Sequence, residues 1–214
     1  MPLTDPQVAT YLLEVREVVE LMLGRFTEIE AISGHWERAK SSEERQLEEW
    51  RTGGTFNDDS WREVMSTRAR SQAQYFLALE GYLAAWARLS LLLFPISGTG
   101  TLAQFRDERG HRLRTELGIS STSILADREL RDSWMHFDER LDAAIFDGTF
   151  RERHYFVRGT EAARLAPGAI ALLEMDTLLV HYRTRNGASA AMDLRNLDRA
   201  VAEVREALRG TIAG

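Results

Sequence analysis

The stretch from Trp61 to Phe94 restricts the fold of this chain more than any other part of its sequence. Apolar side chains recur along it at helical spacing, and in its second half they surround nearly the whole expected helix. A helix that is apolar on all sides has to be enclosed by other elements. We therefore predict a long central helix over residues 61–94, which Ser60 caps at its start and Pro95 ends.

The same periodicity predicts a first long helix before this one. It extends from about Asp5 to Ile32, where Ser33 and Gly34 form a natural stop. The polar stretch 37–51 that follows has residues that favour a helix but a poor apolar stripe. We expect this stretch to be a mobile or partly exposed helix.

Two shorter helices are predicted after the central one. The first covers residues 102–117; Gly110 weakens its middle, because glycine is a poor helix former, and Gly118 signals its end. The second covers residues 127–145 and follows a loop of serine and threonine. With the two long helices, they predict an antiparallel helical bundle.

After Asp147-Gly148 the pattern changes to short apolar runs. Asn186-Gly187 lies between two such runs and is a strong signal for a β-hairpin. The run 169–173 fits a strand and a helical turn equally well. Beyond the hairpin, apolar residues recur at helical spacing from Leu194 to Leu208 and predict a terminal helix.

The whole pattern predicts a mainly α protein in two parts. Residues 1–148 form an antiparallel helical bundle, and residues 149–214 form a small addition of a β-hairpin and a terminal helix. The second part is too small to hold an independent core, so we expect it to pack on the bundle.

Composition narrows the classes of function. The 214 residues include no cysteine, which excludes disulfides and thiolate metal sites. The net charge of −6 argues against broad electrostatic binding of nucleic acid, but not against a local basic groove. The N-terminus lacks the pattern of a signal peptide, and the most apolar run, Leu89 to Ile96, is too short to span a bilayer. We expect a cytoplasmic protein without a membrane partner.

The stretch 127–145 has two unequal helical faces. One carries an apolar stripe, formed by Leu130, Trp134, Phe137, Leu141 and Ile145. The opposite face mixes polar and large apolar residues: Asp132, Met135, His136, Glu139, Ala143 and Phe146. This mixture is not typical of a solvated face. It indicates either packing against another part of the chain or a homodimer interface, which Met135, Ala143 and Phe146 would form.

Within this stretch, Arg131 is followed by the polar Asp132, by three further residues and then by His136. This arrangement, near the start of the last long bundle helix, resembles the motif of the HEPN superfamily. The resemblance covers about residues 5–148 and, outside the motif, rests on helix order. HEPN proteins are small helical bundles, usually dimeric; many are metal-independent ribonucleases, and others only bind RNA or nucleotide. The resemblance implies an endoribonuclease, as in toxins and anti-phage defence effectors, with RNA as substrate and an antitoxin or another protein as partner.

A second stretch, from Arg106 to His111, has the same spacing. We prefer the later match because it lies in the expected final helix of the bundle, on a helix with an apolar stripe. Some HEPN toxins carry a tyrosine two places after the histidine, where a partner enzyme modifies them. Asp138 occupies that place in this chain, so we do not expect this form of regulation.

Cleavage of RNA without a metal ion needs a base that removes the proton from the ribose 2′-hydroxyl. Histidine suits this role because its ordinary pKa lies near neutrality, so we assign the role to His136. Arg131 would stabilise the extra negative charge on the phosphorane with its guanidinium fork. Asp132 would fix the tautomer of His136 or hold Arg131. On an ideal helix Arg131 and His136 lie about 140° apart, so a two-fold interface would have to bring both copies into one cleft.

Other interpretations of the same residues stay open. Asp132, His136 and Glu139 have the spacing of metal ligands on one helix face, but no second ligand helix is evident, so we expect no metal and no cofactor. Alternatively, Arg131 and Asp132 form surface ion pairs and His136 is a packing residue. The protein would then be a non-catalytic helical module that binds RNA, nucleotide or protein. The six arginines and eight acids of residues 125–158 suit this alternative.

Overall fold

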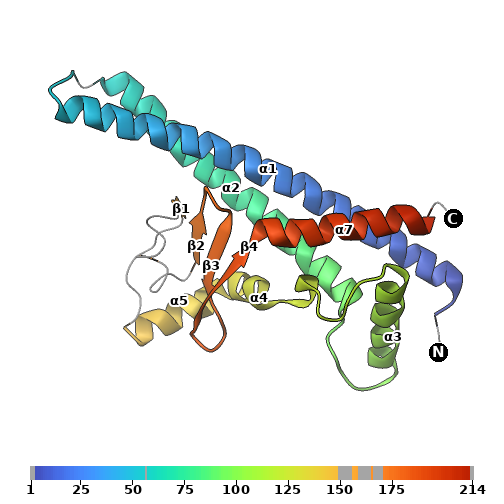
Figure 1. The fold of residues 1–214 in the computed structure, drawn as a ribbon. Helices are drawn as coiled ribbons and strands as arrows, with labels where there is room; N and C mark the ends of the chain where they lie inside the picture. Colours follow the sequence, from blue (N-terminus) through green and yellow to red (C-terminus); the bar gives the residue numbers. More distant parts are fainter. Residues whose placement is uncertain (1–2, 56, 149–155, 159–164, 166–170, 213–214) are drawn as a thin grey trace.

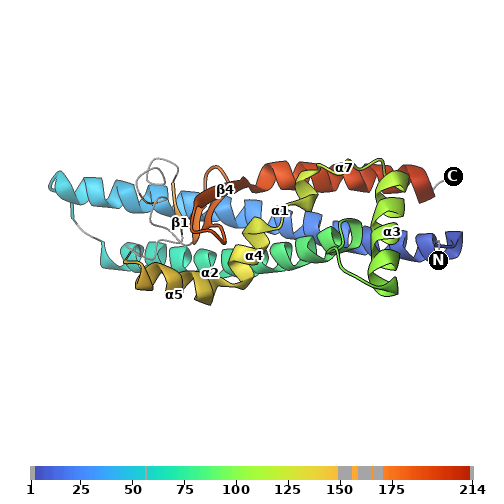
Figure 2. The ribbon, with the colours of Figure 1, turned by 90° about the horizontal axis from the view of Figure 1, so that it is seen from below.

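The computed structural model describes residues 3–55, 57–148, 156–158, 165 and 171–212. Its largest unit is a long antiparallel hairpin of α1 (Asp5–Arg51) and α2 (Asp58–Leu93), shown in Figure 1. α7 (Leu194–Ile212) lies along α1, and α3 (Thr101–Glu116) stands across the end of the hairpin that holds the N-terminus (Figures 1 and 2). The predicted fold class, a mainly α helical bundle, is confirmed.

α1 continues far beyond its predicted end. The stop that we expected at Ser33-Gly34 is wrong, since the helix runs through both residues to Arg51. Ser33 and Trp36 are buried, and the Ser33 hydroxyl donates a hydrogen bond to the backbone carbonyl of Met175. These tertiary contacts outweigh the roughly 1 kcal/mol that a glycine costs in a helix.

Ion pairs, rather than an apolar stripe, fix the polar second half of α1. Glu43 binds Arg68 of α2. Arg158, from the C-terminal part of the chain, donates from Nε to Glu37 at 3.0 Å and from Nη1 to Glu44 at 2.9 Å. Because these partners come from two other parts of the fold, the stretch forms a regular, partly exposed helix.

α2 occupies the central position that its apolar surface predicts, and its inner side chains are fully buried: Tyr75, Leu79, Tyr82, Leu89 and Leu93. Its N-terminus differs from the prediction, because Asn57 rather than Ser60 is the N-cap. The Asn57 side chain accepts a hydrogen bond from the Ser60 amide at 3.0 Å. The Ser60 hydroxyl instead accepts one from Gln46 Nε2 of α1, at 2.7 Å. Asparagine is as strong an N-cap as serine, and its use here frees Ser60 to join the two helices.

By length and composition alone, α2 is also apolar enough to cross a membrane. An 18-residue window within it has a mean hydropathy of 1.4, and 50% of that window is buried inside the fold. The central helix of a bundle has the same properties. Our expectation of a cytoplasmic location therefore stays a prediction.

α3 is clamped onto the end of α2. Arg109 donates a hydrogen bond to the carbonyl of Leu91 at 2.7 Å, and Arg114 donates one to the carbonyl of Leu93. Both arginines thus satisfy carbonyls at a helix C-terminus, where positive charge is favourable. Gly110, which we expected only to weaken α3, permits this approach, since a Cβ there would lie 2.8 Å from the Leu93 carbonyl oxygen.

The C-terminal part contains a four-stranded sheet, which is larger than the predicted hairpin. β1 (Phe156–Val157) runs parallel to β2 (Ala171–Glu174), and β2, β3 (Leu179–Arg183) and β4 (Ser189–Asp193) are antiparallel neighbours. The β3–β4 hairpin turns at Asn186-Gly187 as predicted; Gly187 has a φ of 78°, which glycine adopts without strain. Residues 171–173 of the ambiguous run belong to a strand.

The sheet and the bundle share one hydrophobic core. Leu173 of β2, Val180 of β3 and Met192 of β4 belong to the same buried cluster as the stripes of α1 and α2. α7 adds its predicted stripe, Leu194, Leu197, Val201, Val204 and Leu208. The boundary that we placed between residues 148 and 149 borders residues outside the described part of the chain, and it stays a prediction.

Candidate functional site

The single helix that we predicted over residues 127–145 is wrong. α4 (Glu129–Met135) and α5 (Phe137–Phe146) meet at His136, whose φ of −109° and ψ of 38° are not helical. α4 contacts α2 and β3. α5 extends away from the α1–α2 hairpin, beside the β3–β4 turn (Figure 1). The break therefore puts the candidate base at a joint between a fixed helix and a projecting one.

α4 keeps the predicted apolar stripe. Leu130 is fully buried, and the ring of Trp134 lies 6.0 Å from that of Phe76 on α2. Ser133 is buried beside them. These contacts hold α4 in one orientation against the bundle.

α5 does not continue the stripe. Ile145, which we predicted to face inward, is 57% exposed, and Ala144 is buried instead. Leu141 is half-buried, and the side chain of Phe137 lies outside the described residues. Because the break at His136 changes the helical phase, residue spacing cannot predict one face across both helices.

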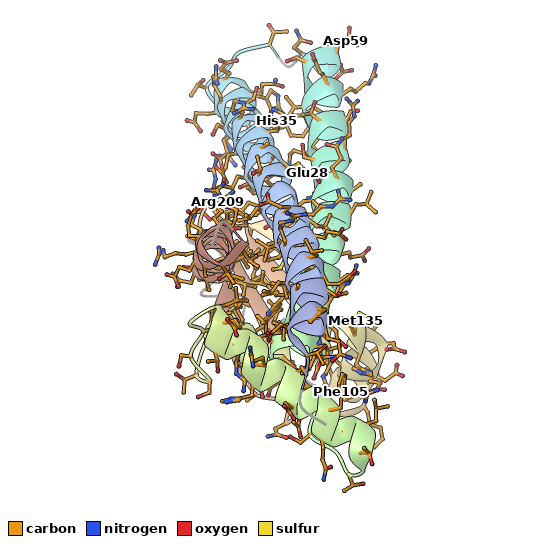
Figure 3. The ribbon with its side chains drawn as sticks, turned by 90° about the vertical axis from the view of Figure 1, so that its right-hand side faces the viewer. Glu28, His35, Asp59, Phe105, Met135 and Arg209 are labelled. Atoms are coloured by element: carbon orange, nitrogen blue, oxygen red, sulfur yellow. The ribbon has the colours of Figure 1, made fainter. Side chains whose placement is uncertain are left out.

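The opposite face is exposed to solvent. Met135 is 70% exposed, Phe146 is 91% exposed, and Ala143 is exposed as well. Figure 3 shows Met135 on the other side of the α1–α2 hairpin from Arg209 of α7. Packing within the same chain, one of the two interpretations of this face, is therefore wrong for these three residues. Met135 belongs to α4, whereas Ala143 and Phe146 belong to α5, and large apolar side chains that are exposed to solvent are typical of contact surfaces.

Asp132 holds Arg131. The Arg131 Nε donates to Asp132 Oδ1 at 2.7 Å, and Nη2 donates to the same oxygen. The Arg131 side chain is only 14% exposed. Close by, Arg128 donates from Nε to the hydroxyl of Ser90 at 3.3 Å. Burial lowers the pKa of Arg128, the charge of Arg131 lowers it further, and Asp132 raises it. Of the two roles suggested for Asp132, the geometry supports the second.

His136 lines an open groove of about 380 Å³. Its Nδ1 lies 3.3 Å from Glu139 Oε1, and its side chain is 55% exposed. The lining residues come from α4, α5 and the β3–β4 turn: Glu129, Asp132, His136, Glu139, Arg140 and Arg185. The groove combines a histidine with two arginines and three carboxylates.

Arg131 and His136 are not brought together within one chain. Arg131 does not line the groove, because its guanidinium group is turned to Asp132. Arg140 and Arg185 do line it, and sequence reasoning missed both. Arg185 stands next to a recognised turn signal, but nothing in the sequence indicated that this turn would lie against α5.

The competing assignments of these residues gain no geometric support. Asp132, His136 and Glu139 all line the groove, but the described residues contain no group of three or more His, Asp or Glu side chains that could hold a metal ion. The second match lies on α3, where Arg106 and His111 are both exposed and neither lines this groove.

One polar network went unnoticed in the sequence. His181 Nε2 of β3 lies 2.5 Å from Glu174 Oε1 of β2, and the Thr177 hydroxyl donates to Glu174 Oε2 at 2.6 Å. Glu174 is buried. Glu174 and His181 sit two strand positions apart across a tight turn, and only the pairing of β2 with β3 brings them together.

The chain matches no known family model, no curated protein and no solved structure. The resemblance to HEPN proteins rests on the Arg131–His136 motif; the long bundle helix that was expected to carry the motif is instead the two short helices α4 and α5.

Proposed function

We propose that the protein is a HEPN-like, metal-independent endoribonuclease whose site is the groove at His136. The position of this histidine carries the proposal: it stands where two helices meet, lines an open groove, and has a carboxylate 3.3 Å from Nδ1. A carboxylate at one ring nitrogen orients the imidazole and leaves Nε2 to act as a base.

In the proposed reaction, His136 takes the proton from a ribose 2′-hydroxyl. The 2′-oxygen then bonds to phosphorus, and the bond from phosphorus to the 5′-oxygen of the next nucleotide breaks. That oxygen takes up a proton from water and leaves as a hydroxyl, and the protonated His136 returns its proton to the solvent, so the products end in a 2′,3′-cyclic phosphate and a 5′-hydroxyl. No oxidant, metal ion or cofactor takes part.

Arg131 is the phosphate-stabilising group of the proposal, and Asp132 positions it. Because Arg131 does not line the groove of its own chain, the proposal includes a homodimer through the exposed face of Met135, Ala143 and Phe146. In this proposal the two-fold axis has to bring Arg131 of one copy to the groove of the other. In a toxin or anti-phage effector of this type, an antitoxin or another protein partner would cover the same region.

A second candidate function is supported by the charge of the groove. Three carboxylates line it against two arginines, and Arg131 is mostly buried. A non-catalytic helical module that binds RNA, nucleotide or a protein partner needs no convergence of Arg131 with His136.

The two functions differ in a cleavage assay with single-stranded RNA in the presence of EDTA. The ribonuclease proposal predicts cleavage that survives EDTA and yields 2′,3′-cyclic phosphate ends. His136→Ala should reduce the rate by about 10²-fold or more, the usual contribution of a general base, with little change in melting temperature because the side chain is exposed. His111→Ala, on α3, is the matched control and should cleave like the wild type.

Loss of cleavage with EDTA would contradict a metal-independent mechanism. An equal loss of cleavage rate in His111→Ala and His136→Ala would show that the groove is not the catalytic site. A pure dimer that cleaves no RNA would leave the non-catalytic module as the function.

A further inference from the structure

Two arginines from separate parts of the chain line the groove at His136. Arg140 belongs to α5, and Arg185 belongs to the β3–β4 turn, immediately before Asn186-Gly187. The C-terminal sheet therefore contributes a cation to the wall of the candidate site, in addition to packing on the bundle.

Both arginines keep unused hydrogen-bond donors. Arg140 Nε is buried without a hydrogen-bond partner. Arg185 is exposed and forms no hydrogen bond or ion pair with any residue that the structure describes. Unpaired guanidinium groups at the wall of a groove are well suited to a phosphate, which accepts two of their N–H groups at once.

The carboxylates of the groove are largely engaged with other groups. Asp132 is bound by Arg131, and the Glu139 carboxylate lies beside the His136 ring. Glu129 is the remaining carboxylate in the lining. An anion that enters the groove therefore meets the guanidinium groups of Arg140 and Arg185, and two carboxylates, Glu129 and Glu139, that no arginine or lysine of the described residues binds.

The size of the groove limits what can enter it. A volume of about 380 Å³ is at the lower end of the range for small-molecule sites, roughly 300–1,000 Å³, and suits one nucleotide. Double-stranded RNA is bound across two minor grooves by broad basic surfaces. The net charge of −6 and the mixed charges of the groove do not provide such a surface.

We propose that Arg185 and Arg140 together bind the phosphate of one unpaired nucleotide beside His136, either a free nucleotide or a residue in an RNA single strand. The choice of a nucleotide rests on the function proposed above; the anion site itself rests on the two arginines. The β3–β4 turn is then part of the binding site, and Arg185 is its phosphate contact.

Calorimetric titration with two probes tests this inference independently of cleavage. The probes are uridine 3′-monophosphate and a short single-stranded RNA with 2′-O-methyl riboses, which cannot form a cyclic phosphate. Arg185→Glu should weaken binding of the bound probe by about tenfold or more, whereas Arg199→Glu, its matched control, should weaken it by less than about twofold. Arg199 is an exposed arginine of α7 that does not line the groove, and the two changes alter net charge equally.

The results separate this inference from the proposed function. Equal weakening by Arg185→Glu and Arg199→Glu, or tighter binding of duplex than of single-stranded RNA, would overturn the inference; so would a wild type that binds neither probe. If Arg185→Glu binds the probe as tightly as the wild type and His136→Ala alone abolishes cleavage, the anion site is wrong and the ribonuclease proposal is supported. If Arg185→Glu no longer binds the probe but the wild type cleaves no RNA, the anion site is supported and the proposed catalysis is wrong.

Discussion

α3 and the α4–α5 pair carry the same spacing of arginine and histidine, but the fold uses the two in opposite ways. On α3, two neighbouring arginines are bound to carbonyls of α2, and Gly110 allows close contact between the helices. At the second place the helix breaks at His136, and large apolar side chains and an unpaired Arg185 lie at the surface. Arg106 and His111 are thus exposed residues of a helix that other arginines clamp to α2, whereas His136 lines an open groove. Spacing alone does not distinguish them; the surrounding contacts do.

The largest difference is expected between two arginine-to-lysine changes. Arg131→Lys keeps the positive charge but loses the two-pronged contact, so RNA cleavage should fall by about 10²-fold. Arg106→Lys, at the equivalent place on α3, should leave the rate of cleavage unchanged. Single-turnover cleavage rates of the two variants should be compared. Similar rates in both variants would contradict a functional difference between Arg131 and Arg106.

A glycine change tests whether α3 is a clamp. Gly110→Ala would place a Cβ 2.8 Å from the Leu93 carbonyl oxygen, and overpacking of this kind costs about 1–3 kcal/mol in free energy of unfolding. Gly24→Ala in α1 has no atom within 4 Å of the new Cβ and should stabilise the protein by about 0.5–1 kcal/mol. Urea unfolding measures both, and a Gly110→Ala protein as stable as the wild type would show that α3 does not depend on this contact.

Charged substitutions of exposed apolar residues on α4 and on α3 test which of the two helices forms the dimer interface. Met135→Glu introduces a charge into the exposed face of α4 and should weaken the proposed dimer by about tenfold or more. Leu102→Glu changes a residue of α3 that is 62% exposed and should not affect the dimer. Sedimentation at micromolar concentration gives the result. A wild type that sediments as a monomer would exclude the dimer altogether.

The smallest expected effect is on the stability of the bundle, through a half-buried carboxyl group on α7. Burial, with Glu30 nearby, raises the pKa of Asp198 on α7 from 3.8 to about 6, while Arg205 lowers it. Because this pKa is higher in the folded state than in the unfolded chain, the free energy of unfolding falls as the pH rises from about 4 to about 6.

Asp198→Asn removes this penalty. It should be more stable than the wild type by about 1 kcal/mol at pH 8, a value reduced for the partial exposure of the carboxyl, and no more stable at pH 4. The same gain at both pH values would contradict the raised pKa. Neither groove binding nor cleavage should change.

The sequence predicted those features that depend on local chemistry and periodicity. The apolar circumference of α2 predicted its central position, Asn186-Gly187 predicted the β3–β4 turn, and the spacing of Leu194 to Leu208 predicted the buried face of α7. In each case the residues that carry the pattern also make the contacts.

The errors arose where distant residues decide the local structure. α1 continues through Gly34 because Trp36 and Ser33 pack against other elements, and the spacing around Gly34 cannot show that. His136 interrupts a helical pattern at the joint between α4 and α5, and residue spacing alone does not show this joint. Arg185 belongs to the groove only because the sheet folds back over the bundle.

The most direct test of the account is to observe the histidine side chains while a ligand is added. The chain has five histidines, so a ¹H–¹⁵N spectrum of the imidazoles is simple, and His136→Ala and His111→Ala assign the two signals of interest. Uridine 3′-monophosphate should shift the His136 signal and leave the His111 signal unchanged. An unshifted His136 signal, or an equal shift at His111, would contradict the claim that the groove between α4, α5 and the β3–β4 turn is the functional site.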